Sequence, residues 1–299
     1  MMIVLLAIVG ATAVAGCSNA GLGEVLASSK TLAYGSPVWI GDAIYFLQYS
    51  ANDSSGGVSA MKMRPGEPAE AVTVQSPDCR RPAEERPSIN ALVAMSDHEL
   101  GLVMSCGNSL EPNRSAFVRK DIRGKEQTTV TPIDFGGWGA AWSASSDSVY
   151  SRVESCPSQG MKAVGKTSSE CVGGADVRFP AVTESGTLFF LANQCGTERA
   201  GPPTTYAVCR YDGAGRITSL ALGVRDPWAL TVSGDRIVVA GKVNGSSGLW
   251  SLEDGLFRSL AKGDYRGGAF TPDGKRLAAT LRDDGWFSTR WSLRLISVP

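Results

Sequence analysis

The seven cysteines are the residues of this sequence whose number and spacing point most directly to a chemistry. If the first one, Cys17, has a separate role, six remain, and an even number of cysteines in an exported chain predicts disulfide bonds. Six cysteines can pair in many ways, but the spacing favours neighbours, so that each bond closes one hairpin-sized loop. The expected bonds are Cys79–Cys106, Cys156–Cys171 and Cys195–Cys209. With no C-x-x-C motif and no histidine near any cysteine, we expect no metal and no other cofactor.

His98 is the single histidine of the chain and hence its one imidazole for acid–base chemistry. It lies in residues 96–99, at the tip of an expected hairpin, where the simpler interpretation is an exposed turn residue. The sequence has no G-x-S-x-G motif, and no serine or cysteine can be assigned to His98 as a nucleophile. We therefore name no catalytic residue.

Residues 160–167, from Gly160 to Thr167, fit the phosphate-loop pattern G-x-x-x-x-G-K-[ST]. Such a loop binds phosphate because a strand leads into it and a helix leaves it. Here residues 161–164 read as a strand between Cys156 and Cys171, and no helix fits after them. We interpret the match as a coincidence and expect no nucleotide ligand.

The N-terminus carries no charge before Lys30, and residues 1–15 are almost all apolar. An apolar run of about fifteen residues is the length of a signal-peptide core and too short for a membrane span of about twenty. It ends in Val14-Ala15-Gly16-Cys17, which resembles the bacterial lipobox. The resemblance implies that residues 1–16 are a signal peptide, cleaved before Cys17, and that Cys17 carries lipid. Two or three acyl chains would anchor the protein to the extracytoplasmic face of a membrane.

The composition excludes several classes of protein. The 299 residues contain 29 Lys+Arg and 29 Asp+Glu, so the formal net charge is zero and gives no electrostatic footprint for nucleic acid. A hydrophobic content of 43% is too high for a disordered chain. The 35 glycines point to many short strands joined by turns.

A hairpin pattern repeats along the chain at intervals of roughly 40–50 residues. Its clearest copy is an apolar strand, a Pro272-Asp273-Gly274 turn and a second apolar strand. The six copies cover residues 38–46, 92–100, 141–150, 181–190, 228–239 and 269–279. This periodicity predicts an all-β, six-bladed β-propeller that forms a single domain, residues 17–299, with a short tether from Cys17 and blades from about residue 36.

The two ends of the chain complement each other in this interpretation. After residues 292–298 the last blade lacks a fourth strand, while residues 22–33 supply a spare strand before the first blade. We expect the N-terminal strand to complete the last blade, which closes the ring and removes two open sheet edges.

The segment Phe270-Thr271-Pro272-Asp273-Gly274-Lys275-Arg276-Leu277 resembles the WD40-like repeat of TolB-type propellers, which also occurs in the propeller domains of prolyl oligopeptidases. The match is good in the sixth copy, fair in the fourth and fifth, and poor in the first three. The resemblance implies a six-bladed propeller with an extracytoplasmic binding or scaffolding role, and it carries over no catalytic residue.

Four arginines hold similar positions ahead of the inner strands, where propeller ligands usually lie: Arg86, Arg178, Arg225 and Arg266. Trp138 and Tyr34 fall at comparable points of two other blades. Arginines around one channel mouth would attract carboxylates or phosphates. The alternative is that each arginine pairs with a turn carboxylate or a backbone carbonyl between blades.

These features favour a lipid-anchored binding scaffold for a protein, peptide or envelope polymer, without catalysis. The alternative is a propeller enzyme of the lyase, hydrolase or lactonase type, with its site at the mouth of the central channel. Few acidic residues fall at rim positions, Asp176 and Asp226 being the nearest, so binding is preferred. A third interpretation is a structural partner of a membrane complex, which would use its long loops.

Overall fold

The computed structural model describes residues 23–51, 57–75, 87–106, 115–124, 127–133, 139–153, 156–165, 171–286 and 288–299. These residues form β-strands and one short 3₁₀ turn, η1 (Pro157–Gln159). The strand content confirms the all-β class expected from the repeats. In the described part of the chain, no helix has the length and apolarity needed to span a membrane.

The first and last strands of the chain share one sheet, in the order β1-β25-β24-β23. The strands are β1 (Glu24–Ser29), β23 (Asp264–Phe270), β24 (Arg276–Asp284) and β25 (Thr289–Ser297). β1 runs antiparallel to β25, with Ser28 opposite Ser292. The N-terminal strand therefore takes the place that the sequence predicted for it, and it covers an edge of β25 that would otherwise be unpaired.

Three further sheets each contain four consecutive strands. The first has β2 (Leu32–Ile40), β3 (Ala43–Ser50), β4 (Ser59–Met63) and β5 (Glu70–Ala71). The second has β6 (Pro87–Ala94), β7 (Glu99–Cys106), β8 (Ser115–Asp121) and β9 (Gln127–Ile133). The third has β10 (Ala140–Ser143), β11 (Ser148–Arg152), β12 (Met161–Gly165) and β13 (Cys171–Val172).

The remaining large sheet has the order β14-β15-β18-β19-β20-β21-β22. Its strands are β14 (Arg178–Val182), β15 (Leu188–Ala192), β18 (Thr205–Tyr211), β19 (Ile217–Ser233), β20 (Arg236–Val243), β21 (Ser246–Glu253) and β22 (Leu256–Lys262). A two-stranded sheet, β16 (Gln194–Cys195) and β17 (Glu198–Arg199), lies beside it. Residues 217–225 of β19 pair with β18, and residues 224–233 pair with β20. One long strand therefore ends one four-stranded unit and begins the next.

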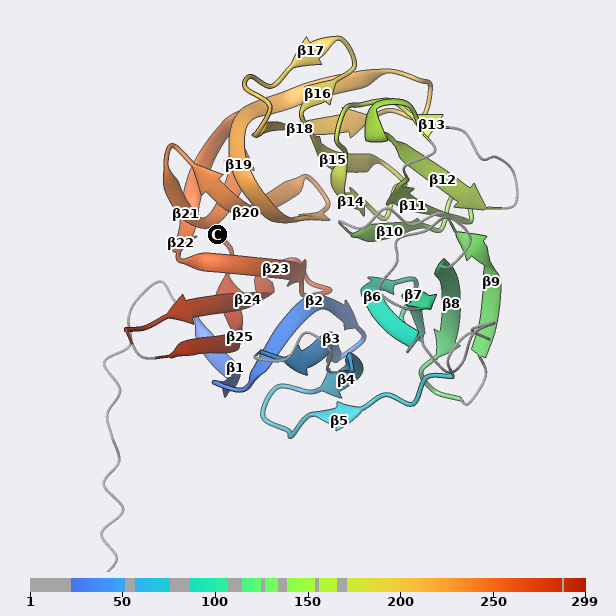
Figure 1. Cartoon of the computed structure of the whole chain (residues 1–299), viewed down its shortest axis with the longest axis vertical. Coiled ribbons are helices and arrows are strands. Elements are labelled where there is room, and N and C mark those ends of the chain that lie inside the picture. Colours follow the sequence, from blue (N-terminus) through green and yellow to red (C-terminus); the bar gives the residue numbers. More distant parts are fainter. Residues whose placement is uncertain are drawn as a thin grey trace, which may run out of the picture.

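The sheets are arranged around a centre, with one strand of each unit innermost (Figure 1). The innermost strands β2, β6, β10, β14, β19 and β23 pack each against the next, and β23 packs against β2. This radial arrangement is propeller-like, as the repeat predicted.

The middle strands are buried on both faces, because each sheet is sandwiched between its neighbours. In β3, Tyr45 packs in a cluster with Leu102 of the following sheet, whereas Phe46 packs in a cluster with Leu293 of the preceding one. Such strands read as continuous apolar runs rather than as an alternating pattern. Burial on both faces therefore explains the apolar residues that flank each predicted turn.

The repeated turn is a compact hairpin held by its own backbone. The Gly274 N–H donates to the Thr271 carbonyl at 2.8 Å, and the Lys275 N–H donates to the Asp273 carboxylate at 3.0 Å. Gly274 has a φ of 67°, in the left-handed region that glycine adopts without steric cost. Because these contacts are local, the turn leaves a recognisable sequence signature.

Candidate functional site

The innermost strands enclose a central cavity of about 810 Å³. Its aromatic lining residues are Tyr34, Trp39, Tyr49, Trp142, Phe179, Trp228, Phe270 and Trp291. Polar groups such as Ser88, Asn90 and Thr231 lie among them. Ligand pockets are commonly about 300–1,000 Å³ in volume and mostly apolar, with a few polar groups. The central cavity therefore has the size and character of a ligand site.

The two ends of the cavity differ. The hairpins that follow the inner strands gather at one end, where Arg236 Nη1 donates to the Gly274 carbonyl of the neighbouring hairpin at 2.6 Å. We call this the hairpin end. At the opposite end, register shifts interrupt the pairing of an inner strand with its neighbour in five of the units. We call this the bulge end.

Among the described residues that line the cavity, two carry a charge. Arg266 stands at the bulge end, beside the register shift of β23. Glu184 stands at the hairpin end, in the turn that follows β14. The cavity is therefore positive at the bulge end and negative at the hairpin end.

The bulge end also holds an unusual backbone conformation. Ser36, Phe179 and Asp226 have φ values of 45°, 48° and 43°, and each precedes a proline. A bulky residue such as Phe179 rarely adopts positive φ, and such residues concentrate where surrounding structure enforces them. Bulges of this kind re-aim side chains. The turn at Asp226 brings Pro227 and Trp228 into the wall of a second hollow at this end.

A side pocket of about 530 Å³ lies off the axis at the bulge end, against β19, β20 and β23. It shares Trp228 and Arg266 with the central cavity. The charged residues that line it are Arg178, Asp226, Lys242, Asp264 and Arg266. Three cations thus face two carboxylates across one hollow, counted over the part of the chain that the structure describes.

Arg266 is held in place by two neighbours. Its guanidinium carbon lies 3.5 Å from the ring centroid of Trp228, and Nη2 donates to Asp264 Oδ2 at 2.6 Å. Its Nε is buried and has no hydrogen-bond partner among the described residues. Arg266 therefore keeps a fixed position in the wall between the two hollows.

Arg178 has a more structural environment. It donates from Nε and Nη2 to the Asp176 carboxylate at 3.2 and 3.0 Å, and its guanidinium lies over the Tyr206 ring at 4.7 Å. Asp176 also accepts from Arg152 Nη1 at 3.1 Å and from the Tyr206 hydroxyl. Burial alone would raise the pKa of Asp176, but the hydrogen bonds from Arg178 and Tyr206 and the nearby charges hold it below its usual value. Asp176 thus joins the sheets of β11 and β14.

The structure brings together only some of the predicted rim residues. Arg266 and Tyr34 line the central cavity, although Tyr34 is buried, at 5% exposure, with its ring edge-on to Phe46. Arg178 lines the side pocket with Arg266. Arg225 is exposed on β19 and lines neither hollow, because the chain passes through the register shift between Arg225 and Ala229.

Two other rim residues, Arg86 and Trp138, lie outside the described residues, as does the predicted lipidation site Cys17.

Three residues of the side pocket were not singled out from the sequence: Lys242, Asp264 and Trp228. The Asp-x-Arg spacing, present at Asp176 and Arg178 and again at Asp264 and Arg266, could have indicated the local ion pairs. Lys242 carries no such signal, because its approach to Asp226, at 2.8 Å, depends on the pairing of β19 with β20.

Within the described residues there are two disulfide bonds, Cys156–Cys171 and Cys195–Cys209, and both join the neighbours that the spacing favoured. Their Cα atoms are 5.7 and 5.6 Å apart. Cys79 lies outside the described residues, so the third pair, Cys79–Cys106, stays a prediction.

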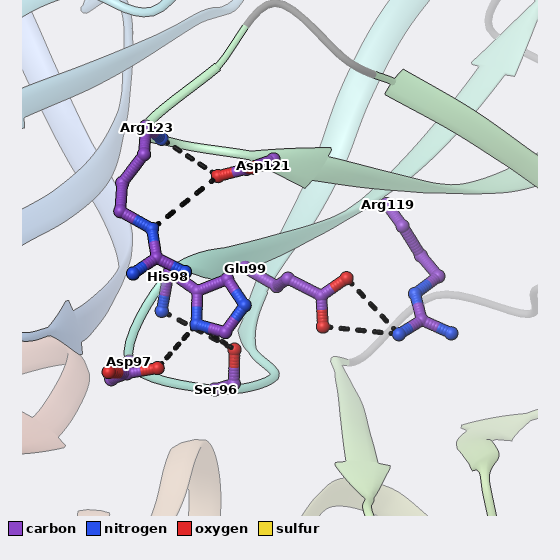
Figure 2. A network of polar contacts seen from close by, with 7 residues as sticks. All are labelled: Ser96, Asp97, His98, Glu99, Arg119, Asp121 and Arg123. Carbon is purple, nitrogen blue, oxygen red and sulfur yellow. Dashed lines mark hydrogen bonds and ion pairs between the residues drawn. The ribbon is translucent and has the colours of Figure 1, made fainter.

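His98 lies in a partly exposed turn, and Figure 2 shows its polar neighbours. Ser96 Oγ lies 3.3 Å from His98 Nδ1, and Asp97 Oδ1 contacts the same nitrogen. A Ser–His–Asp triad requires the two partners on opposite nitrogens of the imidazole. The adjacent Glu99 is paired with Arg119 at 3.1 Å. The arrangement is that of a turn stabilised by local contacts.

The phosphate-loop match does not have the structure of a phosphate loop over the residues described. Met161–Gly165 is the strand β12, which pairs with β11 and β13. Lys166 and Thr167 lie outside the described residues. No cluster of three or more potential metal-binding side chains occurs in the described ranges.

Solved structures resemble this chain over most of its length. TolB from Acinetobacter baumannii matches with a TM-score of 0.54 at 13% identity, over 89% of this chain and 64% of TolB. The β-propeller domain of the Trilobed protease from Pyrococcus furiosus matches with a TM-score of 0.55 at 10% identity, over 89% of this chain and 94% of that domain. The fold is a TolB-like β-propeller.

A prolyl endopeptidase also matches this β-propeller, with a TM-score of 0.50 at 10% identity, over 93% of this chain and 43% of that enzyme. The chain thus spans less than two thirds of the length of TolB and less than half of the endopeptidase. No sequence-family model and no curated protein matches it. At these identities the likeness concerns the fold alone, and the site must be argued from its own residues.

Proposed function

We propose that this protein is an exported, lipid-anchored β-propeller that binds a peptide or envelope molecule in its central cavity and carries out no catalysis. The observation that carries the proposal is the cavity of about 810 Å³ with its aromatic lining. Aromatic side chains provide large apolar contact area, and the interspersed hydroxyl and amide groups can orient a ligand. TolB, whose fold is similar, raises the expectation of a scaffold, by analogy only.

The charges of the lining favour binding over catalysis. Acid–base chemistry at a channel mouth calls for titratable groups that converge on one point. Glu184 and Arg266, the charged lining residues in the described ranges, stand at opposite ends of the cavity. Glu184 and Arg266 are therefore better placed to orient a ligand along the axis of the cavity than to take part together in acid–base chemistry.

A six-bladed, closed ring is the finer architecture that we propose. Six inner strands line the cavity within the described residues, and β23 packs against β2. The pairing of β1 with β25 supports closure of the last blade by the N-terminal strand. Closure by the N-terminal strand removes two open sheet edges and would hold the cavity in a fixed shape.

The disulfide bonds support export, because such bonds persist in oxidising compartments. Gly23 lies against Leu295 and Ile296 and close to the hairpin end, because Val298 hydrogen-bonds to Lys275 of the β23–β24 turn. The six-residue step from Cys17 to Gly23 reaches at most about 20 Å. A lipid on Cys17 would therefore hold the hairpin end near the membrane, with the bulge end facing away.

Site-specific photo-crosslinking in membranes tests the proposal. A photoreactive amino acid placed at Val182, which lines the central cavity, should give a discrete adduct with the bound ligand in cells. The same group at Leu256, which is 66% exposed on β22, is the matched control and should not give it. Absence of a Val182-specific adduct would contradict ligand binding in the cavity.

Lipidation is tested separately. Incorporation of labelled palmitate should be lost in Cys17→Ala, and the variant should leave the membrane fraction. Retained label, or unchanged membrane association, would remove the anchor from the proposal while leaving the cavity site standing.

A further inference from the structure

We infer that the side pocket at the bulge end binds the anionic head of a small organic ligand, a carboxylate or sulfonate, whose apolar body lies in the central cavity. This inference rests on the proposed function, since it assigns a ligand chemistry to the same cavity. It depends on three observations: the shared wall of the two hollows, the excess of cations among the described residues that line the side pocket, and the fixed position of Arg266 between them.

The shared wall determines how a ligand can lie. Trp228 and Arg266 belong to the lining of both hollows. A molecule that spans them would have its apolar part among the aromatic residues of the cavity and its polar part beside the guanidinium. The adjoining volumes of about 810 and 530 Å³ are large enough for a ligand of drug-like size.

The side pocket has one more cation than it has carboxylates. Arg178, Lys242 and Arg266 face Asp226 and Asp264. Lys242 and Asp226 form a 2.8 Å ion pair whose side chains are 47% and 58% exposed. Exposed pairs of this kind are weak, so a ligand anion can replace Asp226 as the partner of Lys242.

Arg266 is the prearranged part of the site. The Trp228 ring beneath its guanidinium and Asp264 at Nη2 fix its orientation, so little side-chain entropy remains to be lost on binding. Its buried Nε lacks a partner among the described residues. Arginine in such a fixed position is suited to oxyanions such as carboxylates and sulfonates.

A matched pair of fluorescent probes tests the inference on the full-length protein. Anilinonaphthalene sulfonate carries an aromatic body and one negative charge, whereas phenylnaphthylamine has the same aromatic framework without the charge. Both should bind with increased emission in competition with each other, and the sulfonate should bind about tenfold more tightly. Added salt should weaken binding of the sulfonate alone.

Three variants locate the charge effect. Lys242→Met and Arg266→Met should each weaken binding of the sulfonate about five- to tenfold and leave phenylnaphthylamine unchanged. Asp226→Asn should strengthen sulfonate binding about threefold, because it removes the competing carboxylate. A gain of affinity cannot arise from misfolding. Asp226→Asn therefore still tests the inference if Arg266→Met proves unstable. Arg216→Met, with Arg216 75% exposed and paired to Asp212, is the control.

The outcomes separate the two levels of the proposal. If both probes bind equally and no variant changes their ratio, the anionic head site is wrong and the cavity site stands. If neither probe binds, or if Val182→Trp in the cavity leaves both affinities unchanged, ligand binding in the cavity is itself contradicted. Loss of both probes in Lys242→Met would also count against the inference, because that change would not be confined to charge.

Discussion

The guanidinium carbon of Arg266 lies over the Trp228 ring, 3.5 Å from its centroid. The two residues come from β23 and β19, so the contact joins neighbouring units of the propeller. Desolvated cation–π pairs contribute about 2 kcal/mol, and exposed ones about 0.5–1 kcal/mol. This contact therefore stabilises the packing of neighbouring units at the same place where it builds the candidate site.

A double-mutant cycle should measure that contribution. Arg266→Met and Trp228→Leu should show a coupling free energy of about 1–2 kcal/mol in urea unfolding. Arg282 and Trp291, whose carbon-to-centroid distance is 6.0 Å, are the matched control and should couple by less than about 0.5 kcal/mol. Equal coupling free energies in the two cycles would show that the short distance between Arg266 and the Trp228 ring adds no stability.

Acid should remove a stabilising contribution of Asp176. Its pKa lies below the usual value because of Arg178, Tyr206 and Arg152, so its contribution is complete above about pH 4 and is lost as the pH falls through the folded-state pKa. Asp176→Asn should cost about 2–3 kcal/mol of unfolding free energy at pH 7. The difference from the wild type should shrink at pH 3.

The control for Asp176 is Asp42→Asn. Asp42 is 74% exposed and bonds to Arg64 at 2.8 Å, so its loss should change stability little. Urea unfolding of the three proteins at both pH values provides the comparison. A difference between Asp176→Asn and the wild type that stays constant with pH would rule out the ionised carboxylate as its source.

Each observed disulfide bond should stabilise the fold. The bonds close loops with sequence separations of 15 and 14 residues, for which chain-entropy estimates give about 3 kcal/mol each. The double variants Cys156→Ala/Cys171→Ala and Cys195→Ala/Cys209→Ala should each lose about this much free energy of unfolding. They should therefore unfold at a lower urea concentration than the wild type. Unfolding midpoints that do not respond to either pair would contradict structural roles for these bonds.

The third disulfide is open to a count of thiols. Unfolded, unreduced protein carrying Cys17→Ser should show no free thiol if Cys79 pairs with Cys106. Two reactive thiols per chain would disprove that pairing. The four cysteines of the two observed bonds are the internal reference, because they should show no thiol before reduction.

Removal of β1 should destabilise the sheet that it completes. A chain that starts at residue 30 lacks the strand that pairs with β25, together with Leu26 and Ala27, which pack on the core. We expect a loss of at least about 2 kcal/mol relative to a chain that starts at residue 23, with self-association through the exposed edge. Urea unfolding and size-exclusion chromatography measure the two effects. Identical midpoints and elution would argue against the closing role of β1.

Much of the fold could be predicted from the sequence because its signals are local. The turn at Thr271–Arg276 is held by hydrogen bonds between residues at most five apart, so its residues recur wherever such a hairpin recurs. The two observed disulfide bonds join cysteines that are 15 and 14 residues apart and close local loops. The position of the N-terminal strand could also be predicted, because the sequence shows a spare strand before the first blade and a missing fourth strand in the last one.

The candidate site could be predicted only in part. Arg178, Arg225 and Arg266 occupy equivalent positions in the repeat, yet the first and last line the side pocket and Arg225 does not. The cause is the register shift between Arg225 and Ala229, which follows from how β19 is shared by two units. A bulge of this kind changes where side chains point without changing the spacing along the chain.

The sequence by itself therefore determined the strands, the hairpins, two cysteine pairs and the repeat that arranges them around an axis, because these depend on residues close together in the chain. The tertiary structure alone decided which charges meet. Lys242 from β20, Arg178 from β14 and Arg266 from β23 share one hollow because neighbouring units pack side by side. That packing depends on side-chain volumes and strand registers in units far apart along the chain, which no local pattern encodes.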